Sequence, residues 1–120
     1  MSAHRLRGCR GSASLFVVTA ALMLTAVALL VMAAMTIMAT QTRASQAADL
    51  AALAGAEAVF STSEPCAQSA RIANANQSQL ESCDIRALDV QVAVSAVPPV
   101  PGGRHLIVRA TARAGPPDDP

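Results

Sequence analysis

The sequence predicts an α+β protein in which a long N-terminal transmembrane helix continues into an extracytoplasmic helix, followed by a short second helix and a C-terminal β-hairpin. Three observations predict this fold. No charged residue occurs from Ser12 to Thr42, a helix-forming segment without proline follows, and two stretches of alternating apolar residues lie near the C-terminus. Hydrophobic residues make up 52% of the chain and aromatic residues only 2%, a bias typical of a membrane helix.

The first element is a transmembrane helix over residues 12–42. At about 1.5 Å per residue, its apolar part from Leu15 to Met38 covers roughly 36 Å, slightly more than the hydrocarbon core of a bilayer. A cleavable secretory signal is the alternative, because arginines precede the apolar run and small residues such as Ala39 and Ala44 follow it. The apolar run is far longer than the usual signal-peptide core, so we expect a retained anchor.

Basic residues predict the orientation of this helix. Arg5, Arg7 and Arg10 precede the span, whereas Arg43 alone follows it closely. Positive charge favours the cytoplasmic side, so residues 1–11 form a basic cytoplasmic tip and the rest lies outside. We therefore expect a single-pass inner-membrane protein with an extracytoplasmic C-terminal domain.

Residues 43–60 predict a helical extension, since Gln46 to Val59 reads QAADLAALAGAEAV, with one glycine and no proline. Small residues recur every four positions along it and form one smooth face: Ala44, Ala48, Ala52 and Ala56. This face suits close packing, either within the domain or against another subunit. A larger apolar stripe lies beside it, formed by Leu50, Leu53 and Phe60.

Residues 61–114 predict a small domain stapled by a disulfide. A short second helix should begin near Pro65, because proline is tolerated in a first turn. Cys66 and Cys83 are expected to form a disulfide in the oxidising space outside the membrane. This bond should stabilise the folded domain by about 3 kcal/mol. An unbroken helix would hold their Cα atoms roughly 25 Å apart, too far for a disulfide, so the helix must end between them. Asn74 and Asn76 are the expected end, because Asn tolerates the left-handed conformation.

Two alternating stretches predict the hairpin. Each places apolar residues at even positions, Leu88 to Val94 in the first and Leu106 to Ala112 in the second. Val97 to Gly103 between them is rich in proline and glycine and predicts the connecting loop. A shared buried face requires that the numbers of two paired residues have an even sum. A sum of 200 sets Asp89 opposite Thr111, whereas a sum of 202 sets Asp89 opposite Arg113; we expect 202 because it pairs opposite charges. The helical extension should cover this face.

Several function classes are disfavoured. Acids outnumber arginines from Arg43 onward, which disfavours a nucleic-acid binder. His105 stands alone on its side of the membrane without a CxxC motif, so no metal site is expected. The segment after the membrane offers no recognisable catalytic spacing, and Gly102-Gly103 is too short for a phosphate loop. We expect no enzymatic activity, cofactor or small-molecule substrate, and a disordered tail over residues 115–120.

Three segments resemble the TadE/TadG-like proteins of tight-adherence (Flp-type) pilus systems, especially the short actinobacterial TadE-like type. The first is Arg10 to Ser14, directly before the apolar run, and the second is Arg43 with Gln46 to Ala56 after it. The third begins at Cys66, continues through the turn at Asn74 to Asn76, Leu80 and Cys83, and ends with the strand DVQVAV and the sequence RATARAGP. The resemblance extends over residues 10–117, with the second segment the most specific part.

The resemblance implies a pilin-like fold and a pseudopilin-like envelope protein that joins or assists a pilus or secretion apparatus. Its partners would be the membrane, other assembly proteins or further copies of itself. Family members of the pilin type are cut by a prepilin peptidase after a glycine, a position that carries over to Gly11. Phe16, however, stands where those members carry a glutamate, which favours an accessory or minor subunit over a major one. The alternative is a stand-alone envelope protein, anchored or released, that binds an unknown partner.

Overall fold

The computed structural model describes residues 10–61 and 63–117 and divides at Ala34/Met35 into two compact units. The first unit contains the N-terminal part of helix α1 (Arg10–Val59), and the second begins at Met35 and contains all other elements. The second unit combines two helices with an antiparallel sheet of three strands. The predicted α+β class is confirmed. The predicted basic cytoplasmic tip, residues 1–11, lies largely outside the described residues.

Helix α1 runs without interruption from the apolar segment into the alanine-rich segment, as the absence of proline predicts. Its threonine hydroxyls bond back to the helix itself: Thr19 donates to the Phe16 carbonyl at 2.9 Å and Thr25 to the Ala21 carbonyl at 2.8 Å. These polar groups are therefore satisfied without another helix. By length and composition α1 is able to cross a membrane, and its most apolar stretch of 18 residues contains no buried residue.

Helix α2 (Pro65–Ala75) begins at the predicted proline and ends where the pairing of Cys66 with Cys83 requires. The end differs in detail from the expectation. Gln77, with a φ of 58°, adopts the left-handed conformation, whereas Asn76 has a φ of −101°. The Gln77 amide donates to the Asn74 carbonyl and the Ser78 amide to the Ala73 carbonyl, the two bonds of a Schellman motif. The motif's position decides which residue is left-handed, and here it selects Gln77.

The sheet contains β1 (Gln79–Arg86), β2 (Asp89–Ala96) and β3 (Val108–Ala114) in that order. The sequence predicted only the hairpin that β2 and β3 form and did not predict β1. A β-bulge between Leu80 and Ser82 explains the miss. The bulge places an extra residue in β1, so Leu80 and Cys83 both pair with inward-facing valines of β2 although they are three positions apart.

The register of the hairpin has the predicted parity but not the predicted value. Gln91 pairs with Arg113 and Val92 with Ala112, which corresponds to a sum of 204 and not 202. Even positions remain on one face, as expected. The expected direct pairing of Asp89 with Arg113 is wrong, yet the two side chains still form an ion pair along the diagonal. The long arginine side chain reaches across this offset, so the charge pair did not determine the register.

The loop between β2 and β3 is longer than expected. We call residues 97–107 the β2–β3 loop; it contains the short 3-10 helix η1 (Gly103–His105), and Gly102 before it has a φ of 77°. Leu106 was predicted to start the second strand on its buried face. Instead its amide donates to the Gly103 carbonyl and its side chain is 47% exposed, because η1 delays the strand to Val108.

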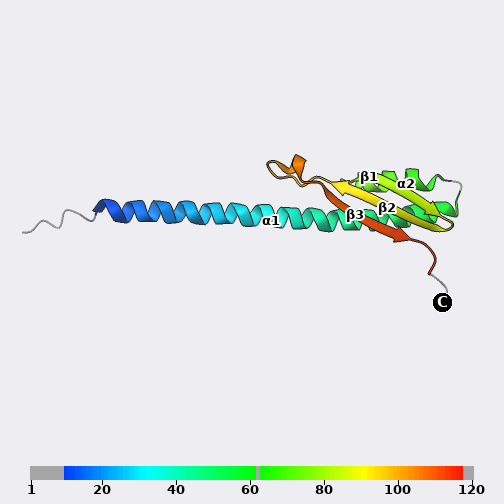
Figure 1. Ribbon diagram of the computed structural model, residues 1–120, viewed down its shortest axis with the longest axis horizontal. Coiled ribbons are helices and arrows are strands. Elements are labelled where there is room, and N and C mark those ends of the chain that lie inside the picture. The colour runs from blue at the N-terminus through cyan, green and yellow to red at the C-terminus, as the bar shows by residue number, and fades with distance from the viewer. Residues whose placement is uncertain (1–9, 62, 118–120) are drawn as a thin grey trace, which may run out of the picture. The chain divides into compact units, whose positions relative to one another are not determined.

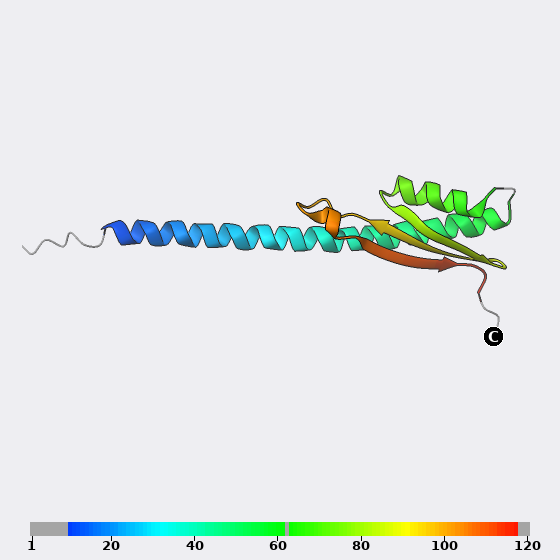
Figure 2. The same ribbon diagram turned by 45° about the horizontal axis from the view of Figure 1, so that its top comes forward.

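The core of the second unit lies between α1, α2 and one face of the sheet (Figures 1 and 2). It consists of small side chains from α1 and valines from β2, and the valines are almost fully buried: Val90, Val92 and Val94. Alanine allows the helix backbone to approach the sheet closely, which explains how a core almost free of rings is filled. Of the predicted disordered tail, Gly115 lies against Asp89, and residues 118–120 lie outside the described part.

Candidate functional site

Gly11, the position to which the resemblance assigns peptidase cleavage, lies at the start of α1. Gly11 is the second residue of the helix, and a Cβ built there meets no atom within 4 Å. Phe16 follows within the same helix with 77% of its side chain exposed. Large apolar side chains remain exposed along this unit up to Met32, so the helix presents an apolar surface suited to lipid or to other apolar helices.

The four-residue alanine repeat lies in the core of the second unit. Ala44 and Ala48 are 0% exposed, Ala52 is 1% exposed and Ala56 is 8% exposed. All four belong to the same apolar cluster as the β2 valines. Of the two uses that the sequence left open, close packing within the domain is the one this face serves here.

The elements approach one another closely at Gly55, where α1 meets α2 and β2. A Cβ on Gly55 would lie 2.9 Å from the Cγ1 of Val90 and closer still to the hydroxyl oxygen of Ser69. Ser69 is 0% exposed and donates a hydrogen bond of 2.8 Å to the Ala51 carbonyl, which joins α2 to α1. Sequence periodicity did not single out Gly55, because the close approach depends on the position of α2.

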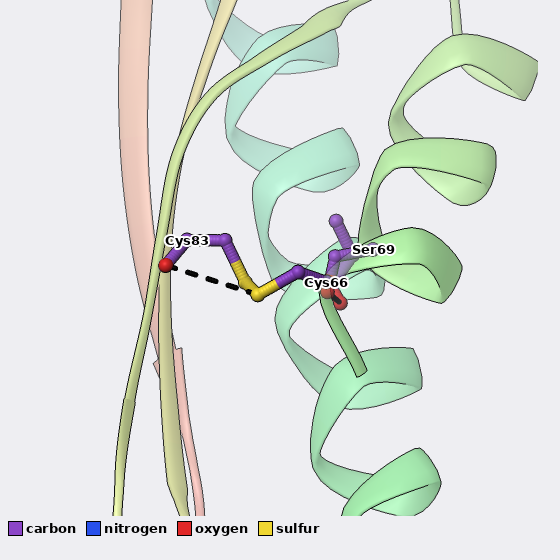
Figure 3. Close-up of a disulfide and its surroundings, with 4 residues drawn as sticks. Cys66, Ser69 and Cys83 are labelled. Carbon is purple, nitrogen blue, oxygen red and sulfur yellow. Dashed lines mark hydrogen bonds between the residues drawn. A yellow bond between two sulfur atoms is a disulfide. The ribbon is translucent and has the colours of Figure 1, made fainter. Parts of the chain in front are cut away.

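The disulfide between Cys66 and Cys83 joins α2 to β1, with a Cα–Cα distance of 5.8 Å. Figure 3 shows both helices on the same side of the sheet, with the two sulfur atoms between α2 and β1. The Cys66 sulfur also lies 3.7 Å from the Cys83 carbonyl oxygen, a simple contact because a disulfide sulfur carries no proton. The pairing agrees with the sequence prediction. It fastens β1, an edge strand, to the helical layer.

An apolar stripe of α1 faces away from this core. Its side chains are about half exposed or more: Leu50 48%, Leu53 53% and Phe60 73%. Leu53 and Phe60 line an open hollow together with Glu57 of α1 and with Arg113 and Pro116 near the end of β3. This stripe, which we call the outer stripe, is the strongest candidate in the second unit for contact with another protein through α1.

The sheet face that points away from the helices is polar and carries two ion pairs. Arg109 and Glu81 approach to 3.0 Å, and Arg113 pairs with Asp89. Glu81 is the residue that the bulge adds, so sequence alternation alone did not predict its pairing with β3. Exposed pairs of this kind stabilise a fold by at most about 1 kcal/mol each, and they keep this face solvated.

Within the part of the chain that the structure describes, no group of three or more His, Cys, Asp and Glu residues is placed to hold a metal ion. His105 lies exposed in the β2–β3 loop. The two cysteines of the domain are joined to each other, and the buried Ser69 hydroxyl bonds to backbone. Cys66, Cys83 and Ser69 therefore serve the fold.

Residues 11–58 match the Tad family, described as "Putative Flp pilus-assembly TadE/G-like". The match covers the apolar segment and the alanine-lined segment of α1, and so confirms the resemblance predicted from the sequence there. No curated protein and no solved structure shows significant similarity to the chain.

Proposed function

We propose that this chain is a minor pseudopilin or accessory protein of a pilus or secretion apparatus. The proposal starts from the match of residues 11–58, most of helix α1, to the TadE/G-like family of Flp pilus assembly. The role of this chain is structural and not enzymatic. It is held in the inner membrane by one pass of α1, with the N-terminus in the cytoplasm and the second unit outside.

One observation supports the proposal most: the same helix contains an apolar segment able to span a membrane and contributes buried alanines to the core of a folded domain. A protein built in this way is retained at the membrane while it presents a rigid domain beside it. The disulfide supports an extracytoplasmic location, because such bonds persist in oxidising compartments. The arginines before the span support the same orientation.

The accessory role is favoured over that of a major subunit by Phe16. In pilin-type members a glutamate at this position is thought to pair with the new N-terminus of a neighbouring subunit, and Phe16 offers no charge for such a pair. We propose instead that contacts with assembly partners are made by the outer stripe of Leu50, Leu53 and Phe60.

The test uses the native host. We expect deletion of the gene to lower the amount of surface pilus or secreted substrate at least about fivefold, and expression of the wild-type chain to restore it. The tagged chain should also co-purify with the inner-membrane assembly platform after mild cross-linking.

Leu53→Arg should weaken both readouts at least about threefold, because it places a charge in the outer stripe. Leu88→Arg is the matched control, since Leu88 is a similarly exposed leucine, at 42%, but lies in the β1–β2 turn. Normal assembly in the deletion strain, together with no recovery of the platform, would reject the proposal and favour a stand-alone envelope protein.

A further inference from the structure

The β2–β3 loop exposes large apolar side chains although its backbone is well held. Val97 is 54% exposed, Leu106 47% and Ile107 52%. The Gly103 amide donates to the Val100 carbonyl at 2.8 Å and the Leu106 amide to the Gly103 carbonyl at 2.9 Å. A Cβ on Gly103 would also collide with the Pro98 carbonyl oxygen, which shows how tightly the loop is folded. The exposure is thus a feature of a defined structure, and in water it is unfavourable.

The loop lies beside the first residues that α1 contributes to the second unit. Val97 and Pro99 line a hollow together with Thr40 and Arg43 of α1. Arg43 is the first charged residue after the uncharged stretch. Figures 1 and 2 both show the loop projecting alongside α1 from the end of the sheet opposite the β1–β2 turn.

Membrane dimensions place this level of α1 at a bilayer surface. Roughly 20 helical residues cross the hydrocarbon core, so a span that begins at Leu15 leaves it near Ala34. The headgroup region adds roughly 5 to 8 Å on each side, or about four or five further residues of helix. Thr40 and Arg43 therefore fall at or just beyond the headgroups, and a loop attached beside them is within reach of lipid.

The distribution of charge in the second unit also favours contact between the loop end and a lipid surface. The chain has no acidic residue before Asp49 and none from Val90 to Pro117. The end that carries the loop therefore holds Arg43, Arg104 and His105 without a neighbouring acid in the loop. The acids Asp84 and Asp89 flank the β1–β2 turn at the opposite end of the sheet. Arg86 and Arg113 balance these two acids, so the turn end of the sheet is neutral. At the loop end Glu81 is paired with Arg109, which leaves the net positive charge of Arg43 and Arg104 to meet a negatively charged lipid surface.

We propose that the β2–β3 loop is a second membrane contact of this protein. Leu106, Ile107 and Val97 enter the interfacial region of a leaflet that contains anionic phospholipid, and Arg104 binds headgroup phosphate. The inference rests on the proposed insertion of α1, which brings the loop to the bilayer surface. The combination of apolar side chains, an adjacent cation and a position where the span ends favours lipid over a protein partner.

The experiment measures the depth of single residues in vesicles of phosphatidylcholine and phosphatidylglycerol. The full chain carries Cys9→Ser, keeps its disulfide, and receives an environment-sensitive fluorophore on Leu106→Cys. Leu88→Cys is the matched control, because both leucines are about equally exposed, at 47% and 42%, but lie at opposite ends of the sheet. Lipids with a nitroxide at a shallow acyl position should quench the Leu106 probe at least about threefold more than the Leu88 probe. Equal quenching of the two probes would overturn the proposal.

Charge is tested in the Leu106→Cys chain. Arg104→Glu should reduce quenching at least about twofold in vesicles with phosphatidylglycerol, whereas Arg86→Glu in the distal turn should leave it unchanged. If Arg104→Glu has no effect, the headgroup contact is wrong. Retention in the vesicles after alkaline carbonate separates the two proposals: a chain that is extracted contradicts membrane insertion itself, and a retained chain with an unquenched Leu106 probe contradicts only the loop contact.

Discussion

Ala87 shows at the residue scale how backbone conformation and sequence disagree at one point. It lies in the tight turn between β1 and β2 with a φ of 56°, a left-handed conformation that costs a non-glycine residue about 1 kcal/mol or more. Two-residue hairpin turns favour glycine at such positions. The sequence contains no glycine there, so alternation alone did not identify this turn.

We therefore expect Ala87→Gly to raise the free energy of unfolding of the second unit by about 0.5 to 1 kcal/mol. Denaturant unfolding of the full chain in detergent, followed by circular dichroism, measures it. Ala93→Gly in β2 is the control and should lower stability by about the same amount, because Ala93 is extended and gains nothing from glycine. A loss of stability for Ala87→Gly would show that the turn is unstrained.

At the scale of elements, the helices were predictable and the sheet only partly so. The limits of α2 follow from Pro65 and from the reach of the disulfide, two local constraints that the sequence displays. Strand β1 was missed because its bulge interrupts the period of two on which strand prediction depends. The register was missed because sums of 202 and 204 bury the same valines, and a flexible arginine side chain does not distinguish them.

The packing of α1 on the sheet gives a prediction at this scale. Ala52→Arg should unfold the second unit or block assembly, because a charged side chain would replace a residue that is 1% exposed beneath the β2 valines. Gln91→Arg on the outer face should change stability by less than about 0.5 kcal/mol. Limited proteolysis of the full chain in membranes distinguishes them, with rapid cleavage expected for Ala52→Arg alone. Equal resistance of both variants would contradict the core described above.

For the whole molecule, the candidate surfaces were less predictable than the core. The alanine face was visible in the sequence, but whether it served the domain or a partner depended on where the β2 valines lay. The apolar residues of the β2–β3 loop looked like part of a buried strand until η1 placed them outside it. Sequence periodicity finds apolar faces, whereas their exposure is decided by segments far away in the chain.

Topology is the prediction at this scale. In intact cells, a membrane-impermeant thiol reagent should leave Cys9 unlabelled and should label Pro117→Cys, because the arginines retain the N-terminus inside. The disulfide keeps Cys66 and Cys83 out of the measurement. Permeabilised cells provide the control in which both positions react. Labelling of Cys9 in intact cells with protection of residue 117 would reverse the orientation.

The disulfide has a mechanical consequence for a domain that is pulled at both ends of its chain. A pull along the chain cannot extend the segment between Cys66 and Cys83, whose sequence separation is 17. Fully extended, that segment would span roughly 60 Å, against the 5.8 Å between the two Cα atoms, so the bond withholds roughly 50 Å from any stretching. Under load β3 can be peeled from β2, because it is the other edge of the sheet and has no such bond. The disulfide thus divides the domain into a part that yields to force and a part, α2 with the first half of β1, that does not.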